Sequence, residues 1–282
     1  MTKSLIQLLQ KAIYWSGLTS AEDIKLFKNS LSNQLKFWLL AVSIGFIAGF
    51  AAVGFRQGIE VLQGLLYGST EAGSFIKFVE KLAWYWKISI PMCGGLIVGI
   101  ILHRYTADGR AKSVADVIQD AALNNGKINQ GGGIASAFAS LITLGSGGSS
   151  GREGPVVHLA AVISGWVCNK IQIDTVSNRD LLGCAVAAAV SASFNAPIAG
   201  ALFALEVVLR HFAIHAFAPI VIASVIGTVI NRLTFGNVTE FILPSANNLG
   251  FYVELPAFIL LGLCCGLIAV ILMRSLFLAD DI

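Results

Sequence analysis

Charged residues are scarce in this sequence: aspartate, glutamate, lysine and arginine make up only 12% of the chain, whereas hydrophobic residues make up 56%. Soluble globular domains carry about 25% charged residues, so this composition excludes an ordinary soluble domain. The net charge of +3 is also too small to indicate nucleic-acid binding. The sequence therefore predicts an all-α, multi-pass integral membrane protein in contact with lipid.

Cysteine pairs with the spacing of a zinc site or a redox motif are also missing. All five cysteines lie in apolar segments and are expected to be small buried residues: Cys93, Cys168, Cys184, Cys264 and Cys265. His211 and His215 are four residues apart and would share a helix face, but no carboxylate nearby completes a metal site. We therefore expect no metal and no other cofactor.

Residues 1–36 lack the uninterrupted apolar core of a cleavable signal peptide. They alternate polar and apolar positions and carry lysines at positions 3, 11, 25, 28 and 36. This pattern predicts an amphipathic segment on the membrane surface with a cytoplasmic N-terminus. The membrane domain is then expected to occupy residues 37–282.

Several later segments are apolar enough to cross a membrane. The first spans residues 37–55, and Arg56 is expected to end it; the second spans 84–102, where Pro91 and the pair Gly94–Gly95 predict a kink or a close helix contact. Further long segments lie at 212–230 and 256–272, and a short helix is expected at 111–123.

The central region has a different pattern. Its apolar runs, at 134–144, 156–168, 181–193 and 198–209, are too short for a hydrocarbon core that requires roughly 20 helical residues. Breaks rich in glycine, serine, asparagine and proline separate these runs. Such segments predict broken helices that meet inside the membrane, as in secondary transporters.

The most informative break is residues 145–158, GSGGSSGREGPVVH. Irregular backbone at membrane depth requires burial in protein or access to water. Pro155 fits the first turn of a helix beginning near Glu153, and the N–H groups at that helix end would attract an anion. The carboxylate of Glu153 could compete with a dissolved anion for those donors.

Nucleotide-binding motifs and simple helix packing account for this break less well. A P-loop requires Gly-Lys-Ser/Thr, whereas the chain has Gly151-Arg152-Glu153, and a dinucleotide fingerprint requires glycine where Ser150 stands. Close packing of small residues explains the glycines and serines but not the two charged residues.

A second break, residues 191–200, repeats the pattern of the first. Asn195 is expected to cap a helix beginning at Ala196, with Pro197 in its first turn. The sequence therefore predicts a second helix N-terminus inside the membrane domain.

Together the two breaks resemble the CLC family of chloride channels and proton-coupled chloride transporters. Residues 151–155, GREGP, match the family signature G-[KR]-E-G-P, and residues 194–200 and 202–206, FNAPIAG and LFALE, resemble its second signature. The resemblance covers roughly residue 37 to the end. It implies broken, tilted helices of an inverted-repeat fold and a homodimer in which each subunit has its own chloride pathway.

The resemblance also assigns roles to individual residues. The glutamate matching Glu153 is the gate, and the anion-binding residues would include Gly151, Arg152, Glu153 and Gly154. Residues 196–210 and the segment after them would contribute to the subunit interface.

The chain departs from the family pattern in three places. The serine of an early chloride-contacting motif aligns with Lys112, and Ser113 is one position away, so either residue could contact the anion. Val207 replaces a glutamate usual in proton-coupled members, which leaves the adjacent Glu206 as a possible proton path. The later anion-contacting motifs have no counterpart, so we expect the first repeat and the start of the second, with the other half missing or supplied by another chain.

The sequence thus predicts chloride transport through a glutamate-gated pathway, similar to a voltage-gated chloride channel, in the cell (inner) membrane. A proton/chloride antiporter or a transporter of another halide is the main alternative. A sodium-coupled transporter is an alternative from another class. An enzyme is disfavoured because no cluster of His, Asp and Glu offers a nucleophile, a base and an orienting group.

Overall fold

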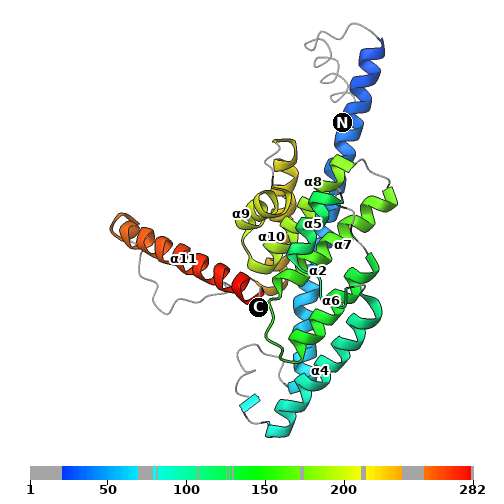
Figure 1. Cartoon of the computed structure of the whole chain (residues 1–282). Helices are drawn as coiled ribbons and strands as arrows, with labels where there is room; N and C mark the ends of the chain where they lie inside the picture. The colour runs from blue at the N-terminus through cyan, green and yellow to red at the C-terminus, as the bar shows by residue number, and fades with distance from the viewer. Residues whose placement is uncertain are drawn as a thin grey trace. The chain divides into compact units, whose positions relative to one another are not determined.

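A computed structural model describes residues 21–68, 79–80, 82–106, 108–124, 126, 128, 130–171, 175–210, 214–236 and 251–280. The described elements are all helices, which confirms the predicted all-α class (Figure 1). The chain divides into two compact units, Met1–Val238 and Thr239–Ile282, and the second contains helix α11 (Phe251–Asp280). Four helical segments are long and apolar enough to cross a membrane: Gln34–Tyr67, Trp84–Tyr105, His215–Phe235 and Leu255–Ala279.

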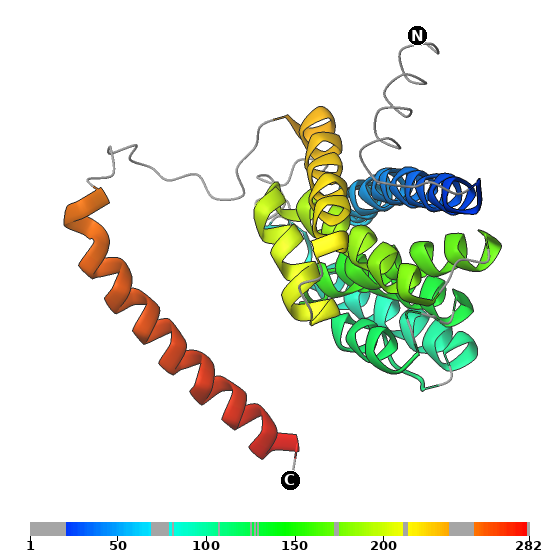
Figure 2. The same cartoon turned by 90° about the horizontal axis from the view of Figure 1, so that it is seen from above.

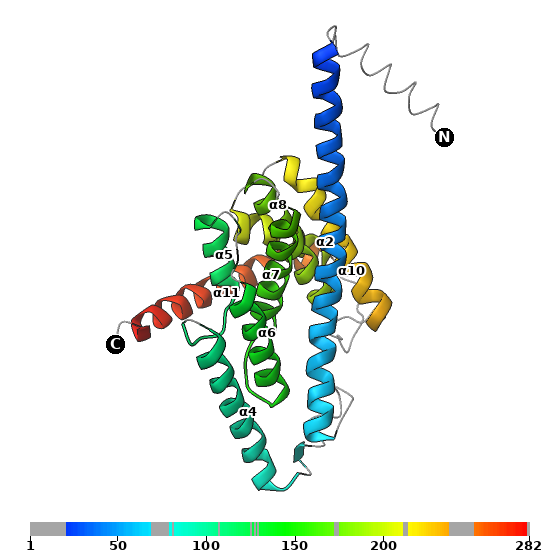
Figure 3. The same cartoon turned by 90° about the vertical axis from the view of Figure 1, so that its right-hand side faces the viewer.

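Helix α2 (Ala21–Tyr67) is one continuous helix that packs against α6, α7 and α8 (Figure 3). It crosses the expected boundary at residue 36 without a break; residues 1–20 lie outside the described part. The prediction that Arg56 ends the first span is wrong. Arg56 Nε lies 3.3 Å from Glu60 Oε1, and its guanidinium lies 4.4 Å from the centre of the Phe235 ring. Because both contacts stabilise the charge, the helix continues for three more turns.

Helix α4 (Trp84–Tyr105) buries only Ile90 and Gly94, so most of its apolar side chains are free to face lipid. Pro91 lies within the helix, and Gly94 packs against Ser146, which confirms the predicted close contact. Helix α5 (Val114–Leu123) is shorter than expected because its N-cap is Ser113 rather than a residue near 111.

The central runs form α6 (Gln130–Gly145), α7 (Glu153–Ile171) and α8 (Thr175–Phe194). These helices are longer than the apolar runs because polar residues extend their ends. Helix α8 packs against α2, α7 and α10 (Ile214–Phe235), and residues 181–189 are almost fully buried. Figure 2 shows α10 beside α2 in the view from above.

Small residues allow this close packing. Gly227 of α10 lies directly on the Ala188 carbonyl of α8, so an added Cβ would collide with backbone. In lipid, where apolar surface gains little by leaving the solvent, such van der Waals contact is a main source of helix association. Helix α9 (Pro197–Phe203) continues as a π-helix, η1 (Ala204–Leu209).

Candidate functional site

The N-termini of α5 and α7 meet at one point, which we call the Ser113–Gly154 junction. Gly154 is the second residue of α7, and a Cβ placed there would lie 3.7 Å from Ser113 Cβ and 4.0 Å from the Val114 amide nitrogen. A methyl group at this position would be in ordinary van der Waals contact with the end of α5, so the glycine leaves a methyl-sized space between the two helix ends. Each end carries a partial positive charge and N–H groups without an intrahelical acceptor, so the junction favours an anion.

Asp116 supplies a protein carboxylate to the α5 end of this junction. Its Oδ2 accepts a hydrogen bond of 2.8 Å from the Ser113 amide, and Arg110 donates to both oxygens at 2.6 and 3.2 Å. Burial alone would raise the pKa of Asp116, but these hydrogen bonds outweigh it and hold the pKa below its usual range. Asp116 is therefore ionised at neutral pH and fixes the first turn of α5.

Lys112 forms ion pairs with Asp116 and with a second carboxylate, that of Asp108. Its Nζ lies 2.6 Å from Asp108 Oδ2 and 3.4 Å from Asp116 Oδ1, and its backbone N–H donates to Ser136 Oγ at 2.6 Å. The hydrogen bond between Lys112 and Asp108 raises the pKa of the lysine and lowers that of the carboxyl. Of the two candidates for the early chloride-contacting position, Ser113 lies against Gly154, whereas the Lys112 ammonium points to carboxylates.

Glu153 lies in the first turn of α7 with 42% of its side chain exposed. Its Oε1 is 3.9 Å from Arg152 Nε, and a Cβ added at Gly151 would lie 3.1 Å from its Oε2. The carboxylate therefore folds back over the glycine segment beside its own helix end. Pro155 lies in the first turn of α7, as predicted, and is buried.

Helix α2 forms hydrogen bonds with the start of the first break, residues 145–158, a role that the sequence did not reveal. Tyr67 donates a 2.7 Å hydrogen bond to the Ser146 carbonyl, and Gln63 Nε2 donates to the Leu144 carbonyl at 3.2 Å. Gly147 then adopts a φ of 90°, which favours glycine. Both donors lie beyond Arg56, in a stretch that was predicted to hold a separate short helix and not a continuation of the first span.

The role of Asp116 also went unpredicted, although the sequence holds a signal for it. Ser113-x-x-Asp116 has the spacing of a helix N-cap box, and both hydrogen bonds of such a box are present at the start of α5. This spacing would have indicated a helix N-terminus at Ser113.

The second break forms a helix start, but not as predicted. Ala196, not Asn195, is the N-cap of α9, and Pro197 is in the first turn as expected. Asn195 cannot serve as the cap because it is left-handed, with φ 54°, and its side-chain oxygen accepts a 2.8 Å hydrogen bond from Arg232 Nε. The Ser224 hydroxyl donates to the Pro197 carbonyl. These two hydrogen bonds join the second break to α10.

Glu206, the possible proton-path residue, lies in η1 and is exposed, as is its neighbour Val207. Helix η1 packs against α5 and α8. A π-helix inserts one extra residue per turn, a feature often found at functional sites. The structure leaves Glu206 outside the residues that form the Ser113–Gly154 junction.

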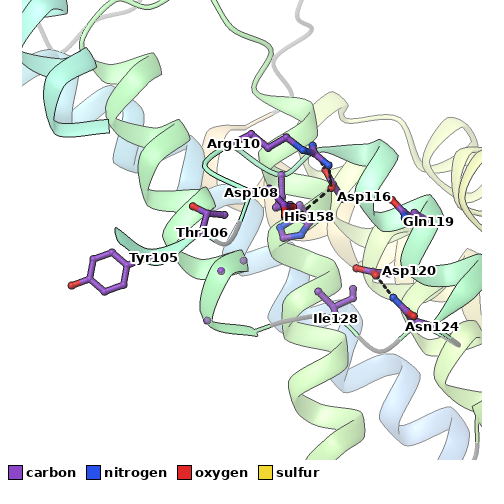
Figure 4. A pocket seen from close by; sticks show the side chains of 14 residues that line it. Tyr105, Thr106, Asp108, Arg110, Asp116, Gln119, Asp120, Asn124, Ile128 and His158 are labelled. Atoms are coloured by element: carbon purple, nitrogen blue, oxygen red, sulfur yellow. Dashed lines mark hydrogen bonds and ion pairs between the residues drawn. The ribbon is translucent and has the colours of Figure 1, made fainter. Parts of the chain in front are cut away.

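A cavity of about 910 Å³ lies beside the junction, where the end of α4, helix α5, the start of α6 and helix α7 meet (Figure 4). Its lining includes Lys112, Asp116, Asp120, Gly132 and His158. Among the described residues, no group of three or more His, Cys, Asp or Glu side chains has the arrangement of a metal site.

Comparison with known proteins agrees with this geometry. Residues 94–282 match the family model described as "Voltage gated chloride channel". The chain is 27% identical over 268 residues to the chloride channel protein CLC-f of Arabidopsis thaliana, which covers 89% of this chain and 33% of that protein.

Two solved structures share the fold. One is a slow cyanobacterial Cl⁻/H⁺ antiporter, with TM-score 0.66, 17% identity and coverage of 82% of this chain and 54% of that one. The other is a CLC-type fluoride/proton antiporter, with TM-score 0.60, 22% identity and coverage of 85% and 54%. These similarities establish the CLC-type fold of broken membrane helices.

The chain spans about half, or less, of the length of the relatives that it matches. The family match nevertheless covers well over half of the chain, and it includes the Ser113–Gly154 junction and both breaks. This integral membrane protein therefore belongs to the voltage-gated chloride channel (CLC) family.

Proposed function

We propose that the protein carries chloride across the membrane along a pathway that passes the Ser113–Gly154 junction, with Glu153 as its gate. The observation that carries this proposal is the meeting of two helix N-termini beside a half-exposed carboxylate. Amide donors replace part of the hydration of an anion, and the glutamate competes for the same donors. The relative from Arabidopsis thaliana, a chloride channel protein by name, supports chloride as the substrate.

The anion-binding set would comprise Ser113, Gly151, Arg152, Glu153 and Gly154. Lys112 would act through its charge alone, because its ammonium is held by Asp108 and Asp116. Asp116 would keep α5 oriented, so that the end of this helix remains a fixed donor.

Within the family, a passive, channel-like pathway is favoured over proton antiport. Val207 cannot titrate, and Glu206 projects from a different direction of the same helix turn. The similar structures include two proton antiporters, so coupled transport is the main alternative.

The complete assembly would be a homodimer in the cell (inner) membrane with a cytoplasmic N-terminus. A second half of the membrane domain, from the same polypeptide or another, would supply the remaining anion contacts. Chloride would be the substrate, without a cofactor, and the protein would act as a conduit rather than an enzyme.

The test is anion efflux from proteoliposomes that contain the complete protein, measured with and without sodium and with and without a pH gradient. We expect chloride efflux that needs neither gradient. Strict dependence on sodium would indicate a sodium-coupled transporter instead, and preference for fluoride would indicate another halide. Absence of anion flux under all conditions would refute the proposal.

A further inference from the structure

His158 lies one helical turn beyond the Ser113–Gly154 junction. It is four residues after Gly154 on α7, so the two positions share a face and are about 6 Å apart along the helix axis. The His158 side chain is only 3% exposed. Gly133 of α6 makes room for it, since an added Cβ there would lie 3.0 Å from the ring atom Cε1.

The same ring lines the cavity beside the junction, where ionisable residues gather (Figure 4). Three acidic and two basic residues line it with His158: Asp108, Asp116, Asp120, Arg110 and Lys112. Helix α6, which packs against α7, has no ionisable side chain between Gln130 and Gly145. On α8 the charged residues Arg179 and Asp180 lie near its start, and on α7 itself Glu153 lies in the first turn.

Two of the three acidic residues of this cavity are poor proton acceptors at mildly acidic pH. Asp116 is held by Arg110 and Ser113, and Asp108 by Lys112, so both have a lowered pKa. Asp120 Oδ1 accepts a 2.7 Å hydrogen bond from the Asn124 amide. The His158 Nδ1, by contrast, is buried without a hydrogen-bond partner among the described residues. Histidine is also the side chain whose charge ordinarily changes between pH 5 and 8.

Burial is the larger influence on the His158 ring: it disfavours the charged imidazolium and lowers the pKa of His158. The carboxylates of Asp116 and Asp120 in the same cavity favour the charged form, and the Lys112 ammonium disfavours it. The ring is therefore expected to be neutral at neutral pH and to become charged under acid conditions. A positive charge within about 10 Å of the junction would strengthen anion binding there.

We propose that His158 is a proton-accepting residue that makes anion binding at the Ser113–Gly154 junction depend on the pH of the cavity. The proposal rests on the proposed function, because it requires an anion at the junction. It assigns to His158 a role separate from that of Glu153, since the histidine strengthens the site when protonated instead of vacating it.

The test is calorimetric titration of the complete protein with chloride in a Glu153→Gln background, which removes the titration of the gate. Because burial lowers the pKa of His158, measurements at about pH 7.5 and about pH 4.5 are used to bracket its change of charge. We expect affinity to rise about tenfold on acidification, as expected for one added charge at this distance in a partly screened site. The double variant Glu153→Gln/His158→Gln should keep the weaker affinity at both pH values.

A rise that persists in the double variant would overturn the proposal. Should His158→Gln fail to fold, Asp120→Asn offers a second test: loss of this carboxylate should move the rise to lower pH, and an unchanged midpoint would contradict the proposal. Absence of chloride binding at either pH would instead refute the proposed function. Binding that is equally strong at both pH values would refute only the role of His158.

Discussion

Gly154 of α7 lies against Ser113, the N-cap residue of α5: a Cβ at Gly154 would be in ordinary van der Waals contact with Ser113 Cβ, at 3.7 Å. Ala would therefore fit without a clash, but its methyl group would cover the point where the two helix ends meet. The contact joins two segments that are about 40 residues apart in sequence. It places donors from both helices around one position.

Gly154→Ala should consequently reduce anion flux while leaving the fold intact. The added methyl group displaces an anion from the junction without pushing the helices apart. We expect a loss of about tenfold or more, because about 1.4 kcal/mol of lost anion binding is already tenfold. Gly165→Ala on the same helix is a matched control, because its Cβ would also lie 3.7 Å from its nearest neighbour, Ile128. Equal flux in both variants would show that the anion does not pass the junction.

Asp116→Asn should destabilise the protein. The buried carboxylate accepts charge-assisted hydrogen bonds from Arg110 and Ser113, so its loss should cost about 1.5–3 kcal/mol in the free energy of unfolding. The exposed pair between Asp108 and Lys112 should matter far less, which makes Asp108→Asn the control. Thermal unfolding of the solubilised protein gives both values.

The stabilisation lost in Asp116→Asn should depend on pH, and the direction of this dependence follows from the pKa of Asp116. The pKa of Asp116 is lower in the folded protein, so its stabilisation is complete above the pKa of the unfolded chain, about 4. This stabilisation disappears as the pH falls through the pKa that Asp116 has in the folded protein. The gap in unfolding temperature between wild type and Asp116→Asn should therefore be full at neutral pH and close in strong acid. A gap that widens on acidification would contradict the assigned charge.

Local chemistry made much of this site predictable from sequence. Glycines, a charged pair and a proline inside apolar sequence indicated the start of α7 at Glu153, because few other structures tolerate them at membrane depth. Pro197 likewise marked the start of α9. These features depend on residues within one turn of the break.

Contacts between distant segments could not be predicted in this way. Arg56 was expected to end a span because an unpaired charge does so, but Glu60 and Phe235 stabilise it. Asparagine is a favoured N-cap residue, but the side-chain oxygen of Asn195 accepts a hydrogen bond from Arg232, 37 residues away. The contact of Ser113 with Gly154 also joins distant segments, and neither residue alone indicates it.

Proton coupling should be weak. A proton needs titratable groups that reach both sides of the membrane. The resemblance to the family implies a glutamate at position 207 in most proton-coupled members, and Val207 cannot titrate. We expect a chloride gradient across voltage-clamped vesicles to produce little proton movement in the complete protein. Sustained uphill proton transport would overturn this expectation, and its loss in Glu206→Gln would identify Glu206 as the carrier.

The 282 residues alone should not form a selective pathway. The junction offers donors from α5 and α7, whereas a desolvated anion needs most of its hydration replaced. The matches cover 54% and 33% of two of the relatives, which leaves room for further contacts in those proteins. We expect this purified chain to give no chloride-selective flux in vesicles without a second polypeptide. Robust selective flux would show that α5 and α7 suffice.

Glu153→Ala tests the gate itself. Protonation weakens the hold of the carboxylate on the α7 donors, so acid on the side that Glu153 faces should open the wild-type pathway. Alanine cannot compete at any pH, and the variant pathway should stay open. Arg152→Ala is a useful comparison, because it removes the charge beside Glu153 but leaves the titrating group in place.

The most direct measurement is chloride flux through the complete protein in vesicles, recorded for wild type and Glu153→Ala as the pH on the Glu153 side is lowered. At saturating chloride, where a change in anion affinity does not limit flux, we predict flux that rises steeply with acid in the wild type. Flux in the variant should already be high at neutral pH and change little. A variant whose flux stays low, or still rises steeply with acid on that side, would contradict the assignment of Glu153 as the gate.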